Sequence, residues 1–372
     1  MARVLVLGGY GVFGSRAAER LAQVDGLEIV IAGRSEGAAR AAAEALAQRA
    51  PGRAVISYAR IDATSLTGED LRRLGATIVI NTAGPYQAQD YRVARAAIDA
   101  GVHYIDLADA RAFVTGIGQL DGAARAAGVL VASGASSVPA LAAAVVDELA
   151  QQFSRVETLT YGISPGNSFD PGTATVASIL GGAGKPFTAL IEGRMSTLHG
   201  WQPLHRHAFL DRRLGWRWFG ACDVPDLDLF PARYPALRSQ RFMAGVEVKT
   251  FHLGLWALSW LVRTGLVQRP ERCAAPLLAV KRRLGFLGSD RGAMFVEIAG
   301  KALDGQPLQR RWELIANEGH GPFIPATPAV ILAKRLAAGT LATRGAMPCV
   351  GLIRLADVTQ EVADLDIHQR FA

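Results

Sequence analysis

Residues 4–14 read Val-Leu-Val-Leu-Gly-Gly-Tyr-Gly-Val-Phe-Gly, and this stretch near the start of the chain decides the fold. Its four consecutive apolar residues are typical of a strand buried on both faces of a parallel sheet. Gly9, Gly11 and Gly14 fill the three glycine positions of a G-x-G-x-x-G motif, and a helical stretch follows over residues 15–21. In this motif the first glycine permits a tight turn, the second lets the backbone approach a pyrophosphate, and the third lets helix and strand pack closely.

The position of the turn between a strand and a helix predicts that it binds a dinucleotide. A helix N-terminus directs N–H groups and a partial positive charge at phosphates. The strand–turn–helix context is what distinguishes a binding motif from a chance match. We therefore expect cofactor contacts from Gly9, Gly11, Val12, Phe13 and Gly14; the alternative is a glycine-rich turn without a ligand.

The end of the second predicted strand indicates which dinucleotide is bound. NAD sites hold an acidic residue about 20 positions after the glycines, where it binds the ribose 2′-hydroxyl. Here the strand over residues 27–32 ends in Gly33-Arg34-Ser35, so an arginine stands at the strand end and no carboxylate does. A guanidinium pairs well with a 2′-phosphate. Arg34 and Ser35 are therefore predicted to favour NADP over NAD, while Ser35 also fits the N-cap of a helix over residues 37–49.

Composition and charge restrict the class of protein. The chain has 372 residues, half of them hydrophobic, which is enough for one or two domains with a large core. Its formal net charge of +7 is spread along the chain, so we assign it to a phosphate-bearing cofactor and expect no nucleic acid partner. The three cysteines, Cys222, Cys273 and Cys349, lack metal-ligand spacing, so no metal site is expected. With neither a cleaved leader nor a membrane-spanning helix expected, the sequence predicts a cytoplasmic protein.

Strands and helices continue to alternate through the first 135 residues. Further strands are predicted over residues 54–59, 76–81, 103–107 and 129–132, with helices between them. This order is typical of a doubly wound parallel sheet in an α/β protein. Residues 1–135 are therefore predicted to form a dinucleotide-binding domain with the Rossmann fold.

Two more predicted strand ends carry candidate cofactor contacts, because ligands of such sheets bind at the carboxyl ends of the strands. Asp62 and Ala63 follow the third strand, and Asp62 fits the adenine edge or a cap of residues 64–74 equally well. Ala83-Gly84-Pro85 follows the fourth strand. Because Gly84-Pro85 neither continues a strand nor starts a helix at once, it forms a rigid shelf suited to lying beside a nicotinamide ring.

Five segments in this part of the chain together resemble the saccharopine dehydrogenase-like reductases. In order they are Gly8-Gly9-Tyr10-Gly11-Val12-Phe13-Gly14, Gly33-Arg34-Ser35, Asn81-Thr82-Ala83-Gly84-Pro85-Tyr86, Gly101-Val102-His103-Tyr104-Ile105-Asp106-Leu107 and Gly134-Ala135-Ser136-Ser137-Val138-Pro139. The resemblance is specific over the first 140 residues. It implies a nicotinamide-dependent oxidoreductase, a second domain that closes over the cofactor, and a place for Gly84 and Pro85 near the nicotinamide.

The chain departs from the pattern of these reductases at two places. Where one common form has a Gly-Glu pair, this sequence runs Ala108-Asp109-Ala110-Arg111, and where Phe-Asp often precedes a serine it has Ala135-Ser136. Both changes fall where the resemblance places the substrate. They argue against the substrate of saccharopine dehydrogenase itself.

From residue 156 the hydrophobic pattern changes from runs to alternation. Alternation with period two occurs in four segments, namely residues 156–163, 241–248, 293–300 and 308–315. It predicts an open, mostly antiparallel sheet with one solvated face, and Asp304-Gly305 is a hairpin signal between the last two strands. We expect a second, α+β domain for the substrate over residues 136–325, and a C-terminal segment, residues 326–372, that returns to the first domain.

Two stretches of the second domain allow more than one interpretation. Residues 199–219 contain three histidines and three tryptophans and are predicted to form a mobile flap with aromatic packing, in preference to a metal site. Residues 250–287 alternate between apolar segments and basic segments. We favour buried helices or a subunit interface, and expect a homodimer. The alternative is an interfacial helix that makes peripheral membrane contact, or a tunnel for a lipid-like substrate.

The chemistry requires a proton donor, because hydride transfer belongs to the cofactor and the protein positions and polarises the substrate. Tyr86 and Asp106 at strand ends, and His320 between two glycines, are the candidates for reduction of a C=O or C=N bond. Arg311 is a candidate for binding a substrate carboxylate. Each also has an ordinary structural role: packing for Tyr86, a cap for Asp106, a solvated strand face for Arg311 and a loop hydrogen bond for His320.

The sequence therefore predicts an NADP-dependent oxidoreductase that acts on a small carbonyl or imine compound. One alternative is an enoyl reductase for a hydrophobic or lipid-linked substrate. Another is a protein that binds or senses NADP without turnover.

Overall fold

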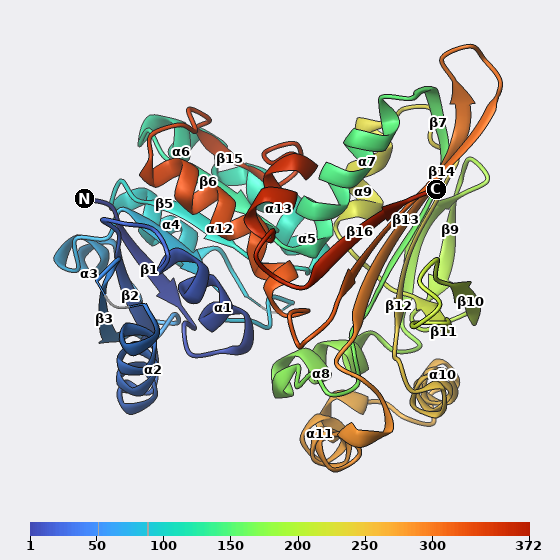
Figure 1. The fold of residues 1–372 in the computed structure, drawn as a ribbon, viewed down its shortest axis with the longest axis horizontal. Helices are drawn as coiled ribbons and strands as arrows, with labels where there is room; N and C mark the ends of the chain where they lie inside the picture. The colour runs from blue at the N-terminus through green and yellow to red at the C-terminus, as the bar shows by residue number, and fades with distance from the viewer. Residues whose placement is uncertain (51, 88) are drawn as a thin grey trace. The chain divides into compact units, whose positions relative to one another are not determined.

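The computed structural model describes residues 1–50, 52–87 and 89–372, and these residues group into two compact units (Figure 1). The first unit comprises Met1–Leu141 and Pro322–Glu361, and the second comprises Ala142–Gly321 and Val362–Ala372. The sequence had set the boundaries at residues 135 and 325 and assigned all of residues 326–372 to the first domain. The structure differs for the last eleven residues, because their strand β16 (Ile367–Phe371) pairs with a strand of the second unit.

The first unit contains the predicted doubly wound sheet. Its seven strands are all parallel in the order β15-β6-β5-β4-β1-β2-β3. They are β1 (Arg3–Leu7), β2 (Glu28–Gly33), β3 (Val55–Arg60), β4 (Ile78–Asn81), β5 (His103–Asp106), β6 (Leu130–Ser133) and β15 (Gly345–Pro348). The strand order reverses between β1 and β4, and ligands of open α/β sheets bind at such a switch point.

The helices of the first unit lie between these strands in the sequence, except α13, which follows β15. They are α1 (Val12–Leu21), α2 (Glu36–Arg49), α3 (Gly68–Arg73), α4 (Arg92–Asp99), α5 (Arg111–Thr115), α6 (Asp121–Ala126), α12 (Phe323–Ala337) and α13 (Leu355–Glu361), with short helical turns at Gly116–Leu120 and Ser137–Leu141. The side chain of Arg16 on α1 lies over the ring of Phe323 on α12, 4.9 Å from its centre. The core includes Leu5, Val79 and Val131 on the sheet, each buried without exposed surface.

The second unit is built on a mixed sheet in the order β10-β11-β12-β7-β13-β14-β16. The strands are β7 (Phe153–Ser164), β10 (His205–Ala208), β11 (Trp216–Ala221), β12 (Ser239–Gly245), β13 (Gly292–Ala302), β14 (Pro307–Ala316) and β16. All neighbours are antiparallel except β12 and β7, which are parallel. Gly305 adopts a φ of +83° in the turn between β13 and β14, as the hairpin signal predicted.

The remaining elements of the second unit are a separate hairpin and seven helical segments. They are β8 (Pro186–Ile191), β9 (Arg194–His199), α7 (Ala142–Ala150), α8 (Gly172–Gly182), α9 (Asp226–Arg233), α10 (Lys249–Arg263), α11 (Ala274–Arg283) and the 3₁₀ turns η3 (Pro270–Cys273) and η4 (Gly285–Leu287). No helix of the described residues has both the length and the apolar composition to span a membrane.

Two predictions for the second unit are wrong. Residues 199–219 form no flap, because β10 and β11 within them extend the main sheet and His207 stacks on the ring of Phe295 at 3.7 Å. Residues 250–287 do form helices, but these are not buried helices: in α10 only His252 and Ser259 are buried. A place for them at a subunit interface or against a membrane stays a prediction.

Candidate cofactor and active site

The glycine turn joins β1 to α1 so closely that side chains cannot enter it. Gly8 has a φ of +79°, a conformation that favours glycine. A Cβ atom on Gly14 would lie 2.7 Å from Oγ1 of Thr82 and would also clash with the carbonyl oxygen of Gly8. A Cβ atom on Gly9 would lie 2.8 Å from the carbonyl oxygen of Val6. The turn therefore holds the helix start against the strand, as a G-x-G-x-x-G motif requires.

The open side of the turn is suited to an anion. A Cβ atom on Gly11 would approach only the Gly8 carbonyl, at 3.0 Å, so a ligand can come close to this residue. The first turn of α1, which contains Val12 and Phe13, carries no acidic residue. N–H groups of a first helical turn have no partner within the helix, so they and the helix dipole favour a phosphate here.

Thr82, which follows β4, contacts the glycine turn, a role that the sequence alone did not assign to it. Its backbone N and its Oγ1 both donate to the carbonyl oxygen of Leu7, at 2.8 and 2.9 Å. Its side chain thereby lies in the space that the absent side chains of Gly8 and Gly14 leave. Only the pairing of β4 with β1 brings Thr82 to this place, so no local sequence signal marks it.

A tyrosine joins the glycine turn to the end of β2. A Cβ atom on Gly33 would lie 2.7 Å from the Tyr10 hydroxyl oxygen, so the tyrosine ring lies directly on Gly33. The Tyr10 hydroxyl accepts a hydrogen bond from the Ser35 N–H at 3.2 Å. The Ser35 hydroxyl in turn accepts from the Ala38 N–H at 3.3 Å and caps α2. The capping alternative for Ser35 is thus realised, and its contact with a cofactor stays a prediction.

Two arginines stand at the carboxyl ends of neighbouring strands. Arg34 follows Gly33, and Gly33 lies opposite Arg60 in the register of β2 and β3. Both arginines are exposed, and both act electrostatically on Asp62. Arg60 was missed by the sequence analysis, because only the strand register places it beside Arg34.

Asp62 forms a local turn. Its Oδ1 accepts hydrogen bonds from the N–H and the hydroxyl of Thr64, at 2.9 and 2.8 Å. These bonds, followed by smaller contributions from the nearby arginines, lower the pKa of the Asp62 carboxyl. Of the two alternatives for Asp62, the cap of the next helix is not realised, because Thr67 caps α3 in a reciprocal capping box with Asp70. A contact of Asp62 with the adenine edge stays a prediction.

The Gly84-Pro85 shelf is exposed, and hydrogen bonds with the side chains of Gln89 and Asn81 fix the loop that carries it. The Gln89 side chain donates to the carbonyl oxygens of Ala83 and Pro85, at 2.7 and 2.9 Å. Oδ1 of Asn81 accepts from the Ala83 N–H at 3.1 Å. These contacts fix the loop after β4 while its outer surface stays accessible to a flat ring.

Tyr86 and Asp106 lie together inside the first unit. The Tyr86 hydroxyl donates to the Asn81 carbonyl oxygen at 2.7 Å, and burial, followed by the charge of Asp106, raises the pKa of Tyr86 well above its ordinary value. Asp106 is fully buried, and its Oδ1 accepts from Oγ of Ser133 at 3.0 Å and from the Gly134 N–H at 2.8 Å. Burial raises the pKa of Asp106 to about 6. Both residues are engaged in holding the strand ends, so their geometry suits positioning better than proton donation.

His320 belongs to the loop after β14 in the second unit. Its Nδ1 accepts a hydrogen bond from the Asp366 N–H at 2.9 Å, and the residue is half-buried. The neutral ring therefore carries its hydrogen on Nε2. Gly319, with a φ of +71°, shapes the loop on one side of the ring.

Arg311 lies in a separate cluster of charges in the second unit. It forms ion pairs with Glu313 and, at 3.6 Å, with Glu297, and its Nη2 lies 2.9 Å from Nε2 of His207. Burial acts to raise the pKa of Glu313, but hydrogen bonds from His207 and Arg311 outweigh it and lower that pKa. The charge of Arg311 is already matched here, so a substrate carboxylate would have to compete for it.

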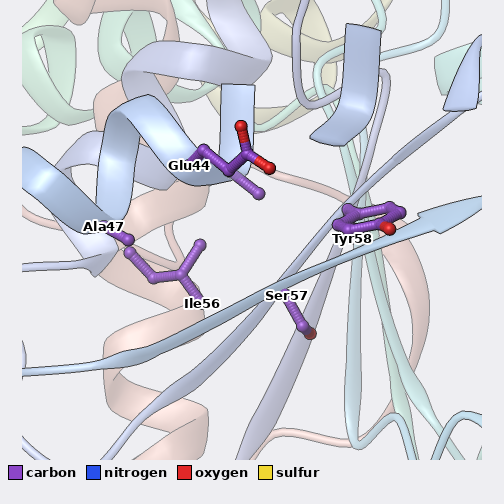
Figure 2. A pocket seen from close by; sticks show the side chains of 6 residues that line it. Glu44, Ala47, Ile56, Ser57 and Tyr58 are labelled. Atoms are coloured by element: carbon purple, nitrogen blue, oxygen red, sulfur yellow. The ribbon is translucent and has the colours of Figure 1, made fainter. Parts of the chain in front are cut away.

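Two other features lie outside this arrangement. A hollow of about 330 Å³ lies between α2 and the edge strand β3, with Glu44 and Ala47 facing Ile56 and Tyr58 (Figure 2). The β3 residues that line this hollow lie in the middle of the strand, away from the carboxyl ends of the sheet's strands. We assign the hollow no ligand. In the described ranges, no three His, Cys, Asp or Glu side chains are arranged to hold a metal ion.

Comparison with known proteins gives three findings. Residues 4–132 match a family described as the saccharopine dehydrogenase NADP binding domain. A lipid droplet localized protein of Caenorhabditis elegans is 33% identical over 145 residues, which cover 37% of this chain and only 34% of that protein. The apo, histidine-tagged, L-glutamate-forming saccharopine dehydrogenase of Saccharomyces cerevisiae aligns over 100% of both chains with a TM-score of 0.69 and 12% identity, which shows a shared fold.

Proposed function

Because residues 4–132 belong to the saccharopine dehydrogenase-like NAD(P)-binding family, we propose that the chain transfers hydride between NADP and a small carbonyl or imine compound. The family match and the shared fold support an NAD(P)-dependent oxidoreductase, and the description of the family names NADP as the cofactor. The observation that carries the proposal is the glycine turn, in which Cβ atoms at Gly9 and Gly14 would clash with the backbone while the side of Gly11 stays open.

Three groups of residues fit the parts of the cofactor. The first turn of α1 holds the pyrophosphate through its N–H groups. Arg34 and Arg60 pair with the 2′-phosphate, since two guanidinium groups match a dianionic phosphate by charge and by paired hydrogen bonds. Gly84 and Pro85 support the nicotinamide. When bound, NADP supplies or accepts the hydride.

We assign the proton to His320. Reduction of a C=O or C=N bond adds hydride to carbon and a proton to oxygen or nitrogen, so the protein must supply that proton. The Nδ1 bond to the Asp366 N–H leaves Nε2 as the hydrogen-bearing atom of His320, and this Nε2–H is the group that we place against the oxygen or nitrogen that receives the proton. Tyr86 and Asp106 then position the strand ends, and Arg311 balances the buried Glu313.

The test measures NADPH binding by calorimetry and NADPH consumption over a panel of aldehydes, ketones, keto acids with amines, and enoyl thioesters. Gly14→Ala is expected to abolish NADPH binding. Its matched control, Gly122→Ala, has open space at its Cβ position and is expected to bind as the wild type does. Wild-type affinity in Gly14→Ala would refute the site, and an inert panel despite tight binding would refute the activity.

A second candidate function is reduction of an enoyl group on a lipid-linked substrate. It is supported by exposed apolar side chains on residues 253–287 and by the lipid droplet localization named for the Caenorhabditis elegans relative. Turnover of long-chain enoyl thioesters in preference to small carbonyls would select it. An NADP-binding protein without turnover is the third candidate, and the inert panel would select that one.

We also propose that the protein is a cytoplasmic homodimer. All three cysteines are free, as is usual in a reducing compartment. Light scattering behind a gel-filtration column tests the dimer, and a monomer at micromolar concentration would refute it.

A further inference from the structure

One surface of the second unit exposes an unusual number of apolar side chains. Of the fifteen large hydrophobic residues that are exposed among those described, eight lie between residues 253 and 287. We call the exposed side chains of residues 249–287 the α10–η4 surface; α10 and α11 lie, with α8, at the lower end of the second unit in Figure 1. Apolar surface gathered in this way marks an interaction site more often than solvent-facing structure.

Helix α10 is turned so that two of its polar side chains face the chain. Its buried residues are His252, which accepts from the Val246 N–H at 3.4 Å, and Ser259, which accepts from Nε2 of Gln202 at 2.9 Å. Trp260 and Leu261 are 42% and 44% exposed. A surface helix ordinarily packs its apolar face on the core, so the outward apolar side of α10 needs a partner outside the chain.

The helical segments that follow α10 in the sequence also expose apolar side chains. Helix α11 buries Ala274 and Leu278 but leaves Leu277 and Val280 exposed. At the end of the segment Phe286 is 77% exposed. An aromatic side chain exposed to this degree gains little from folding and is accessible to a partner outside the chain.

The charge of the surface identifies the partner. Residues 249–287 contain seven Lys or Arg and one acidic residue, Glu271, which gives a net charge of +6. Arg282 is paired with Asp170 at 2.7 Å. Within the described residues no ion pair is formed by Arg269, Arg272 or Arg283. A second copy of the chain would bring the same positive charge against it in a symmetric interface, which is unfavourable.

We propose that the α10–η4 surface docks on an anionic lipid surface. Trp260, Phe286 and their apolar neighbours enter the boundary of headgroups and acyl chains, and Arg269, Arg272 and Arg283 meet the lipid phosphates. This docking stands independently of the oxidoreductase activity. If the substrate is lipid-linked, the same contact brings the chain to it.

The experiment is flotation of the full chain with vesicles of phosphatidylcholine alone or with phosphatidylglycerol added. Binding is expected only to the anionic vesicles, and added salt should weaken it. The triple variant R269E/R272E/R283E should lower the partition coefficient at least about 100-fold, since each cation near an anionic surface contributes roughly fivefold. The double variant F286S/L287S should also lose binding, while the controls Leu303→Ser and Arg238→Glu, exposed elsewhere on the second unit, should keep it.

Other outcomes overturn the proposal. Absence of binding to anionic vesicles, or equal binding by all variants, refutes it. If light scattering shows a dimer without lipid that F286S/L287S dissociates, the surface is a subunit interface and the lipid assignment is wrong. NADPH affinity of the same variants should equal that of the wild type, so failure of docking and failure of the cofactor site are distinguishable.

Discussion

At the scale of single residues, the candidate site contains residues that the sequence alone identifies and residues that only the pairing of strands in the sheet brings there. Gly9, Gly11 and Gly14 form a motif that can be recognised in the sequence, and Arg34 follows the end of a strand that the sequence predicts. Thr82 and Arg60 carry no local signal, because each reaches the site through the register of a neighbouring strand. Parallel strands bring together residues distant in sequence, so pairing must be known before such residues can be found.

The arginine pair predicts a change of cofactor preference. Arg34→Ala and Arg60→Ala should each weaken NADPH binding about 10- to 100-fold, since a hydrogen bond to a charged group contributes roughly 1.5–3 kcal/mol. NADH lacks the 2′-phosphate, so its affinity should stay the same. Calorimetric titration of both nucleotides measures the ratio, and Arg49→Ala, an exposed arginine at the end of α2, is the control. If the ratio of NADPH affinity to NADH affinity is unchanged in both variants, the arginines do not bind the 2′-phosphate.

His320 and Tyr86 are distinguished by kinetics. His320→Ala should lower kcat about 10²- to 10⁴-fold, as for the loss of a general acid, without weakening NADPH binding. Tyr86→Phe removes the bond to the Asn81 carbonyl and should mainly lower stability, by about 1 kcal/mol. Steady-state rates and urea unfolding of the two variants give both quantities. A wild-type kcat in His320→Ala would remove that residue as the donor.

At the scale of elements, the type of an element was easier to predict than its partner. Apolar runs such as residues 4–7 predicted buried parallel strands, and β1, β2, β4, β5 and β6 confirm the prediction. The period-two pattern of β7 and β12 predicted strands as well. The pattern does not indicate whether two paired strands are parallel or antiparallel, and these two are parallel. The four residues of β15, which end in a proline, are too few to show a pattern, so the seventh strand of the first sheet was not predicted.

The aromatic stretch of residues 199–219 shows how composition alone misleads. Three histidines and three tryptophans indicated a flap, yet His207 is packed between Phe209 and Phe295 in the core of the second unit. An imidazole ring stacks as an aromatic ring does. Packing, which the sequence does not contain, turned His207 and Trp201 inward.

Helix α9 predicts a pH-dependent stability of the second unit. Asp226 at its start is fully buried, and burial raises the pKa of its carboxyl to about 8. Because the folded pKa lies above the unfolded value of about 3.9, the protonated carboxyl favours folding at low pH. Stability from this group should fall as the pH rises from about 4 through 8. Urea midpoints of Asp226→Asn should vary less with pH than those of the wild type, whereas the exposed control Asp228→Asn should follow the wild type.

At the scale of the whole molecule, residues 142–321 of the second unit are inserted between the two segments of the first unit. The last strand of the chain also belongs to the second unit. The sequence predicted a C-terminal return to the first domain, and residues 322–361 lie in that unit. Strand β16 was not foreseen, because an edge strand of five residues that alternates weakly resembles a tail. It is tied to β14 by backbone pairing and by a bond of 2.8 Å from the Trp312 indole N–H to Gln369.

The distribution of tryptophans allows the two units to be followed separately. All six tryptophans lie between residues 201 and 312, so their fluorescence reports the second unit alone. A chain that ends at Glu361 loses β16 and exposes the edge of β14. Its tryptophan-detected Tm should fall by several degrees, since about 1 kcal/mol shifts the Tm of a domain of this size by roughly 2–4 °C. NADPH, which we propose to bind at the glycine turn of the first unit, should still raise the transition detected by circular dichroism. If truncation abolishes that NADPH-dependent shift, the first unit does not hold the cofactor on its own and the assignment of the cofactor site to residues 4–132 is wrong.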